Sequence, residues 1–198
     1  TGPGMTAPQH DEGASSPVVK KLGREIRRDA ATIVASLVGL LALLVAGYTA
    51  YIQRQQVSAQ VWPYLMWASS DTGSDYLWIN KGVGPAIVKS TQVLVDGKPQ
   101  RDWKEVMRSL QVAAPNYGQS TFNHNVISAG ETLPWIIFRS HDQFQAFRDA
   151  ARKKLDFKVC YCSTLGDCWV NDTTKGNGNV RIPVDKCPAV PESQQFDD

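Results

Sequence analysis

The segment from Ala30 to Ile52 contains no charged side chain, and it constrains the chain more than any other feature. It reads AATIVASLVGLLALLVAGYTAYI, and as a helix it would be about 34 Å long at about 1.5 Å per residue. That length crosses a hydrocarbon core of about 30 Å. A buried helix of a soluble domain would be shorter and would show polar periodicity. We therefore predict one transmembrane helix over residues 30–52.

A cleaved signal peptide is the main alternative for this segment. Its apolar region would have about 7–15 residues and would be followed by a cleavage site between small residues. The segment here is longer and ends in Tyr48, Tyr51 and Ile52. These features favour an uncleaved signal anchor.

Basic residues are distributed unequally on the two sides of the predicted span. Only Arg54 follows the span closely, whereas five basic residues precede it: Lys20, Lys21, Arg24, Arg27 and Arg28. Positive charge near a span is retained on the cytoplasmic side. We therefore expect the N-terminus in the cytoplasm and the chain after Gln53 outside it.

The rest of the chain divides by composition into four further parts. Residues 1–29 comprise TGPG, which is typical of an expression-tag remnant, and a basic stretch expected to be a disordered cytoplasmic tail. We expect residues 53–60 to form a short linker and residues 189–198 a second disordered tail. Residues 61–188 are numerous enough to bury one hydrophobic core, so they are expected to form a single domain.

The pattern of residues 61–188 is mainly that of β-strands. Aromatic and β-branched runs bounded by turn residues predict strands at 61–70, 75–80, 86–95, 132–138 and 155–163. Capping boxes at Asp102 with Glu105 and at Ser140 with Gln143 predict two short helices. The loop KGVGPA between two of the strands has no following Lys-Ser/Thr and no helix start, so it is not a phosphate-binding loop. The expected fold is one N-terminal transmembrane α-helix and a mainly-β sandwich with two short helices.

All four cysteines follow the predicted span: Cys160, Cys162, Cys168 and Cys187. A compartment that oxidises thiols would join them in two disulfides. Cys160 and Cys162 are separated by one residue in an extended strand and cannot easily bridge each other, so two pairings remain. We favour Cys162 with Cys168 across a hairpin and Cys160 with Cys187.

Two other uses of these cysteines fit the spacing less well. A four-thiolate zinc site prefers Cys-x2-Cys pairs, which this chain lacks. A thiol oxidoreductase requires Cys-x-x-Cys at a helix start, whereas Cys160-Tyr161-Cys162 lies in a predicted strand. A periplasmic thiol-redox or metal-handling protein that uses Cys160 and Cys162 is nevertheless the alternative function.

Charge and motifs indicate neither a nucleic-acid-binding protein nor an enzyme. The formal net charge is only +2, which does not provide the basic face that nucleic-acid binding usually requires. The sequence contains no G-x-S-x-G and no H-E-x-x-H. We expect no catalytic residue, no bound metal and no cofactor.

Candidate partner contacts lie in the polar loop from Asn116 to Asn125. This loop contains Tyr117, Phe122 and His124, which we expect to form an exposed surface for a partner. Trp67 and Trp78 could border that surface, although tryptophans are usually buried.

Small residues recur every four positions at the start of the predicted span. Ala31, Ala35 and Gly39 follow this spacing, which allows a second helix to approach closely. These residues are the candidate contacts for a homodimer or for a larger membrane partner.

Three features together carry a resemblance to a known group of proteins. The anchor, the loop NKGVGPA and the hairpin CYCSTLGDCW are similar to those of uncharacterised single-pass inner-membrane proteins of bacteria with a small extracytoplasmic β-sandwich. The likeness covers roughly residues 61–170. It implies a periplasmic location and an immunoglobulin-like sandwich, and it assigns no functional residue.

The expected function is that of a membrane-anchored periplasmic recognition or assembly module. Such a module would be a non-catalytic subunit or accessory protein of a cell-envelope complex. Its expected partners are the lipid bilayer and a membrane or periplasmic protein, or a second copy of the chain.

Overall fold

The computed structural model describes residues 17–113, 116–175 and 180–198, and it describes side chains from residue 27 onward. The chain separates into two compact units, Thr1–Arg54 and Gln55–Asp198. The first unit contains most of one long helix, and the second contains the β-domain. Residues 1–16 of the expected N-terminal tail lie outside the described residues.

The long helix α1 extends over Pro17–Gln60. Its part from Arg27 to Gln60 is long and apolar enough to cross a membrane, with a mean hydropathy of 2.4 in its most apolar window. Its large apolar side chains are exposed, unlike those of a core helix. The hydroxyls of Thr32, Ser36 and Thr49 donate to carbonyls one turn earlier, which satisfies them within the helix.

The helix is longer at both ends than the predicted span, and two expectations were wrong. Residues 53–60 are helical rather than a linker, because QRQQVSAQ consists mainly of residues that tolerate a helix and no proline occurs between Pro17 and Pro63. Residues 17–29 are helical rather than a disordered tail. Pro17 is the first helical residue, a position at which its missing N–H costs nothing.

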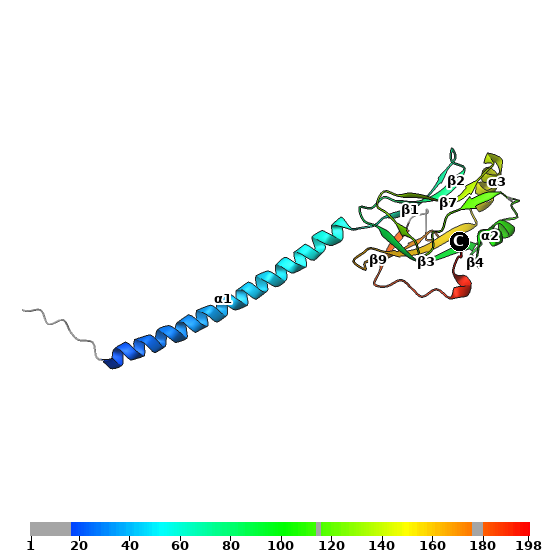
Figure 1. Cartoon of the computed structure of the whole chain (residues 1–198). Helices are drawn as coiled ribbons and strands as arrows, with labels where there is room; N and C mark the ends of the chain where they lie inside the picture. Colours follow the sequence, from blue (N-terminus) through cyan, green and yellow to red (C-terminus); the bar gives the residue numbers. More distant parts are fainter. Residues whose placement is uncertain (1–16, 114–115, 176–179) are drawn as a thin grey trace, which may run out of the picture. The chain divides into compact units, whose positions relative to one another are not determined.

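The β-domain contains two antiparallel sheets (Figure 1). In spatial order, the first has β1 (Leu65–Ser70), β2 (Asp75–Asn80), β7 (Thr132–Phe138) and β5 (Tyr117–Gln119). The second has, in order, β10 (Val180–Val184), β9 (Cys168–Asp172), β8 (Leu155–Cys162), β3 (Ala86–Val95) and β4 (Lys98–Gln100), and β6 (Val126–Ile127) also pairs with β3. The predicted strands correspond to β1, β2, β3, β7 and β8.

Aromatic side chains fill the space between the two sheets. The ring centroid of Phe157 on β8 lies 4.2 Å from that of Trp67 on β1 and 5.4 Å from that of Trp135 on β7. On β8, Phe157, Val159 and Tyr161 are buried, as strand alternation predicts. The two sheets therefore share one core.

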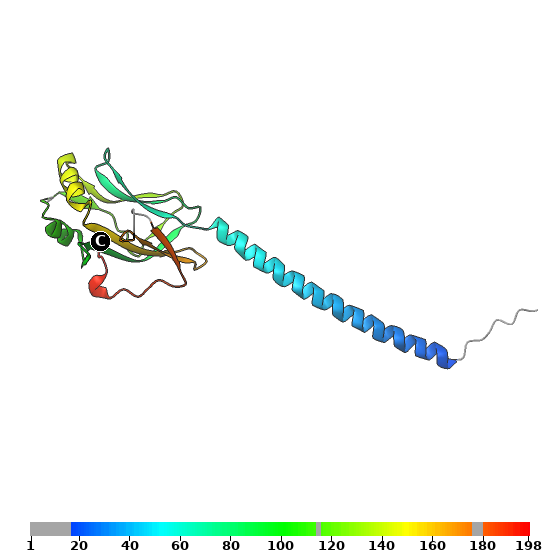
Figure 2. The same ribbon diagram turned by 180° about the vertical axis from the view of Figure 1, so that it is seen from behind.

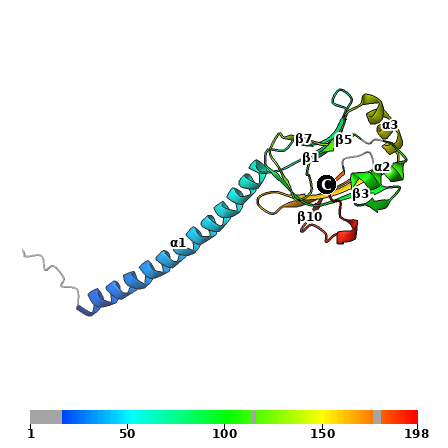
Figure 3. The same cartoon turned by 45° about the vertical axis from the view of Figure 1, so that its right-hand side comes forward.

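Two short helices close one end of this core. They are α2 (Trp103–Leu110) and α3 (His141–Ala151), and they lie together at the far end of the sheets from the end of α1 (Figures 1 and 3). Asp102 caps α2 as predicted, because its carboxylate accepts from the Glu105 N–H at 2.7 Å. Ser140 precedes α3, but its side chain makes no capping hydrogen bond, so the second capping box was wrong.

The C-terminal residues belong to the domain, contrary to the expected disordered tail at 189–198. After β10 the chain passes along the second sheet (Figure 2) and forms a single 3-10 turn, Glu192–Gln194. The Phe196 side chain is 0% exposed and packs against Trp103 and Trp135 at 5.2 and 5.3 Å between ring centroids. Its N–H donates to the Thr91 carbonyl of β3 at 2.9 Å. One buried aromatic residue thus orders a segment whose other residues are mostly polar.

Candidate functional site

The structure separates the three expected partner-contact residues. Phe122 is 0% exposed and stacks on Trp78 at 5.0 Å, so the expectation that it is available to a partner was wrong. Tyr117 is half-buried on β5, and His124 is exposed. The polar loop crosses from the edge of the first sheet to the edge of the second, and its one large apolar side chain enters the core between them.

The half-buried Asp198 carboxylate fastens this loop to the core. It accepts from the backbone N–H groups of Phe122 at 2.8 Å and Asn123 at 3.2 Å, and from Trp135 Nε1 at 2.7 Å. Burial raises the pKa of Asp198, while these three hydrogen bonds oppose the increase. The C-terminal residues are therefore structural supports of the loop, which sequence patterning did not indicate.

Strand β5 presents an open sheet edge beside Tyr117. Gly118 is the hydrogen-bonded partner of Ile137, because the flanking bonds run from Arg139 N–H to the Asn116 carbonyl and from Ser120 N–H to the Trp135 carbonyl. The backbone groups of Tyr117 and Gln119 consequently point away from β7. Within the described part of the chain no strand pairs with this side of β5. Such an edge can accept an extended segment of another chain.

The disulfides have the favoured pairing, Cys160–Cys187 and Cys162–Cys168. Cys162 and Cys168 face each other directly across β8 and β9, as the hairpin predicted. Cys160–Cys187 attaches the segment after β10 to the outer face of β8. No cysteine is left as a thiol, so this state offers no thiolate to a metal and no Cys160–Cys162 dithiol.

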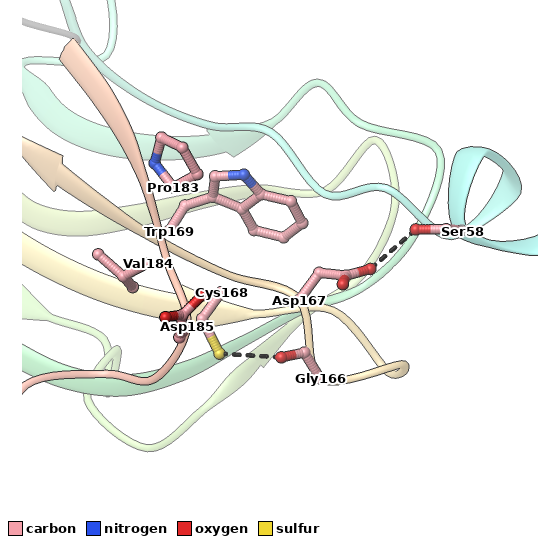
Figure 4. A pocket seen from close by; sticks show the side chains of 8 residues that line it. All are labelled: Ser58, Gly166, Asp167, Cys168, Trp169, Pro183, Val184 and Asp185. Atoms are coloured by element: carbon pink, nitrogen blue, oxygen red, sulfur yellow. Dashed lines mark hydrogen bonds between the residues drawn. The ribbon is translucent and has the colours of Figure 1, made fainter. Parts of the chain in front are cut away.

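A cavity of about 730 Å³ lies beside the Cys162–Cys168 disulfide (Figure 4). Its lining includes Ser58, Asp167, Cys168, Trp169, Pro183 and Asp185. The Ser58 hydroxyl donates to Asp167 Oδ2 at 2.8 Å, which ties the last turns of α1 to the β8–β9 hairpin. Sequence patterning did not indicate this cavity, because its walls come from three segments far apart in the chain.

Near this cavity the Arg181 guanidinium is stacked between aromatic rings. It lies 4.4 Å from the centroid of Trp62 and 4.2 Å from that of Trp169. Burial lowers the pKa of Arg181, and no described carboxylate pairs with it. Cation–π contacts with the rings take the place of an ion pair, and they join β9 and β10 to the residues that follow α1.

The loop KGVGPA packs against the same residues. A Cβ at Gly84 would lie 2.1 Å from the Val61 carbonyl oxygen, and one at Gly82 would lie 2.3 Å from that of Trp62. The two glycines therefore permit a close backbone approach, and the loop is structural.

The residues expected to pack in the membrane lie on α1. Ala31, Ala35 and Gly39 are one turn apart, and a Cβ at Gly39 would have nothing within 4 Å. The helix therefore presents a shallow surface at Gly39 that a second helix could approach.

Comparisons of the chain with protein-family models, with curated proteins and with solved structures gave no match.

Proposed function

We propose that this chain is a single-pass membrane protein whose β-domain serves recognition or assembly outside the cytoplasm. The observation that carries the proposal is a long apolar helix that continues into a β-domain stapled by two disulfides. Disulfides persist in oxidising compartments, and an exposed apolar helix requires a lipid environment. An anchor or signal helix and an extracytoplasmic domain follow directly from these two features.

The bacterial periplasm is the proposed location of this domain. The basic residues before the span support a cytoplasmic N-terminus and an inner-membrane anchor. Two facing antiparallel sheets with a common aromatic core support an immunoglobulin-like sandwich. Domains of this architecture commonly present loops and strand edges to partners, in keeping with an accessory subunit of a cell-envelope complex.

The proposed contact surface is the open edge of β5 with its neighbours Tyr117 and His124. A partner segment in an extended conformation would pair with the outward backbone groups of Tyr117 and Gln119. His124 follows on the same crossing segment and is exposed. Phe122 lies between Tyr117 and His124 in the chain, and its stacking on Trp78 holds this part of the loop against the core.

A photoreactive residue placed at Gln119 tests this surface in the full-length protein in its native membrane. The matched control has the same residue at Lys104, which is exposed on α2. We expect discrete adducts from photoreactive residues at 119 and at 117 and none from position 104, and we expect the adduct from 117 to be lost when Gln119→Pro is added. Equal adducts at 119 and 104, or none at 119, would contradict a contact at the β5 edge.

Self-association through α1 requires a separate measurement. Gly39→Ile places a branched side chain on the proposed packing surface, whereas Leu40→Ile changes a neighbouring lipid-facing position with little change in volume. We expect Gly39→Ile to lower the dimer fraction in detergent or in a bilayer at least fivefold, and Leu40→Ile to leave it unchanged. Equal dimer fractions in both variants would exclude this packing surface.

Retention of the apolar segment distinguishes an anchor from a cleaved signal. We expect the intact mass of the protein recovered from membranes to include residues 30–52. A mature protein that begins after residue 52 would contradict the anchor.

The alternative, a thiol-redox or metal-handling protein using Cys160 and Cys162, has less support. The sulfurs of Cys160 and Cys162 belong to different disulfides in this structure. It would require both disulfides to be reduced before it could act.

A further inference from the structure

The two disulfides are in contact with each other. Cys162 Sγ lies 3.7 Å from Cys187 Sγ, although the two sulfurs belong to different bonds. The Sγ atoms of Cys162, Cys168 and Cys187 all lie within 4.8 Å of one another. A separation of 3.7 Å is close to van der Waals contact between sulfurs. A thiolate at Cys162 would therefore have a disulfide sulfur within reach without movement of the backbone.

Cys168 is the cysteine of this cluster that lines a cavity, and Cys187 is half-buried. Cys168 lines the cavity of about 730 Å³, and its Sγ lies 3.3 Å from the Gly166 carbonyl oxygen at the cavity wall (Figure 4). Cys160 is the most buried of the four cysteines, with 2% of its surface exposed. A small dithiol fits a cavity of this size. A dithiol bound in this cavity therefore meets the Cys162–Cys168 bond from the Cys168 side.

We propose that this cluster is a thiol–disulfide exchange site whose substrate is a dithiol, free or carried by a reducing protein. In the first step a dithiol sulfur bonds to Cys168 Sγ, the Cys162–Cys168 bond breaks, and the electron pair leaves on Cys162. In the second step the Cys162 thiolate bonds to Cys187 Sγ, and the Cys160–Cys187 bond breaks. Cys160 leaves as a thiolate and takes up a proton.

The second thiol of the substrate completes the reaction. It attacks the mixed disulfide and releases Cys168, which is then protonated. The dithiol is oxidised to a disulfide by two electrons, and its two protons end on Cys160 and Cys168. The protein retains one disulfide, between Cys162 and Cys187. This reaction differs from that of a Cys160–Cys162 dithiol, and it does not rest on the proposed recognition function.

The exchange would move the attachment of the C-terminal segment. Cys187 would be bonded to Cys162 instead of Cys160, and because its Sγ already lies 3.7 Å from Cys162 Sγ, the two sulfurs need to approach by only about 2 Å. The direction is toward the hairpin that joins β8 to β9. Reduction at Cys168 thereby changes which residue of β8 holds the segment that leads to Phe196, with a small shift of Cys187.

Limited reduction of the full-length protein in detergent tests the proposal. The protein is treated with equimolar dithiothreitol, quenched in mild acid, where exchange is slow, and alkylated with N-ethylmaleimide. Cleavage after Lys158, Lys175 and Lys186 separates Cys187 from the peptide that contains the other three cysteines. For molecules with two thiols we expect labels on Cys160 and Cys168, and a peptide crosslinked between Cys162 and Cys187. Labels on Cys162 and Cys168 with the Cys160–Cys187 bond retained would overturn the proposal.

A variant tests the second step without a reductant, and a control tests whether the fold directs the exchange. Cys168→Ala leaves Cys162 as a thiol beside the Cys160–Cys187 bond, and we expect the single label to be found on Cys160 at least as often as on Cys162. A label confined to Cys162 in this variant would also overturn the proposal. The wild-type protein unfolded in denaturant before reduction is the control for proximity. The yield of the Cys162–Cys187 peptide should be several-fold higher from the folded protein, and equal yields would show that the fold does not direct the exchange.

Discussion

Replacement of Phe196 by alanine should destabilise the β-domain strongly, although the residue lies in a segment whose composition predicts disorder. The ring is 0% exposed and contacts Trp103 and Trp135 edge to face. Removal of a fully buried phenylalanine ring costs about 3–5 kcal/mol, through lost transfer free energy and the cavity that remains. We expect a loss of about 4 kcal/mol, a large part of the total stability of a domain of this size.

Urea unfolding of the full-length protein in detergent, followed by tryptophan fluorescence, measures this loss. With a slope of about 2 kcal/mol per M urea, a loss of about 4 kcal/mol moves the midpoint down by about 2 M. The matched control is Ser193→Ala, an exposed position three residues earlier, which should leave the midpoint unchanged. A midpoint shift below about 0.5 M for Phe196→Ala would refute the reasoning, because it would show that the segment does not contribute to the core.

Three further predictions concern the supports of the domain. Removal of both Cys160 and Cys187 opens a loop with a sequence separation of 27 and should cost about 3.5 kcal/mol in urea unfolding, against about 2 kcal/mol for the six-residue separation of the other disulfide. Gly84→Ala should lower the melting temperature by several degrees because its Cβ would meet backbone atoms, whereas Gly118→Ala, with nothing within 4 Å, should not. Burial raises the pKa of Asp198 above its unfolded value of 3.8, so its ionisation opposes folding: stability should fall as pH rises from below 4 through the raised pKa, and Asp198→Asn should flatten this pH dependence in unfolding measured at several pH values.

The sequence was sufficient for those elements that have their own local signal. The helix over the apolar segment, the strand at 155–163 and the Asp102 cap of α2 each depend on neighbours within a few residues, and each was confirmed. Strand geometry excluded a Cys160–Cys162 bond and left two pairings, of which the favoured one, with Cys162 joined to Cys168 across a hairpin, was confirmed.

The failures share a different cause. Phe122 and Phe196 are single aromatic residues in polar segments, and only the position of Trp78, Trp103 and Trp135 in the folded core makes them internal. The residue pattern within such a segment does not indicate that one of its side chains will be buried in a pocket formed by other segments. The cavity beside Cys168 was missed for the same reason, since its walls meet only after the β8–β9 hairpin, β10 and the end of α1 are in place.

The C-terminal segment links the sulfur cluster to the proposed partner surface. It is attached to β8 at Cys187, and nine residues later Phe196 enters the core, while Asp198 holds the N–H groups of Phe122 and Asn123. A displacement at Cys187 is therefore transmitted to the loop that carries His124 unless the intervening residues absorb it. We expect the Phe122 and Asn123 amides to exchange with deuterium at least tenfold faster in molecules whose remaining disulfide joins Cys162 to Cys187, measured against the oxidised protein. Unchanged protection of both amides would show that the nine residues take up the shift and that the two sites act independently.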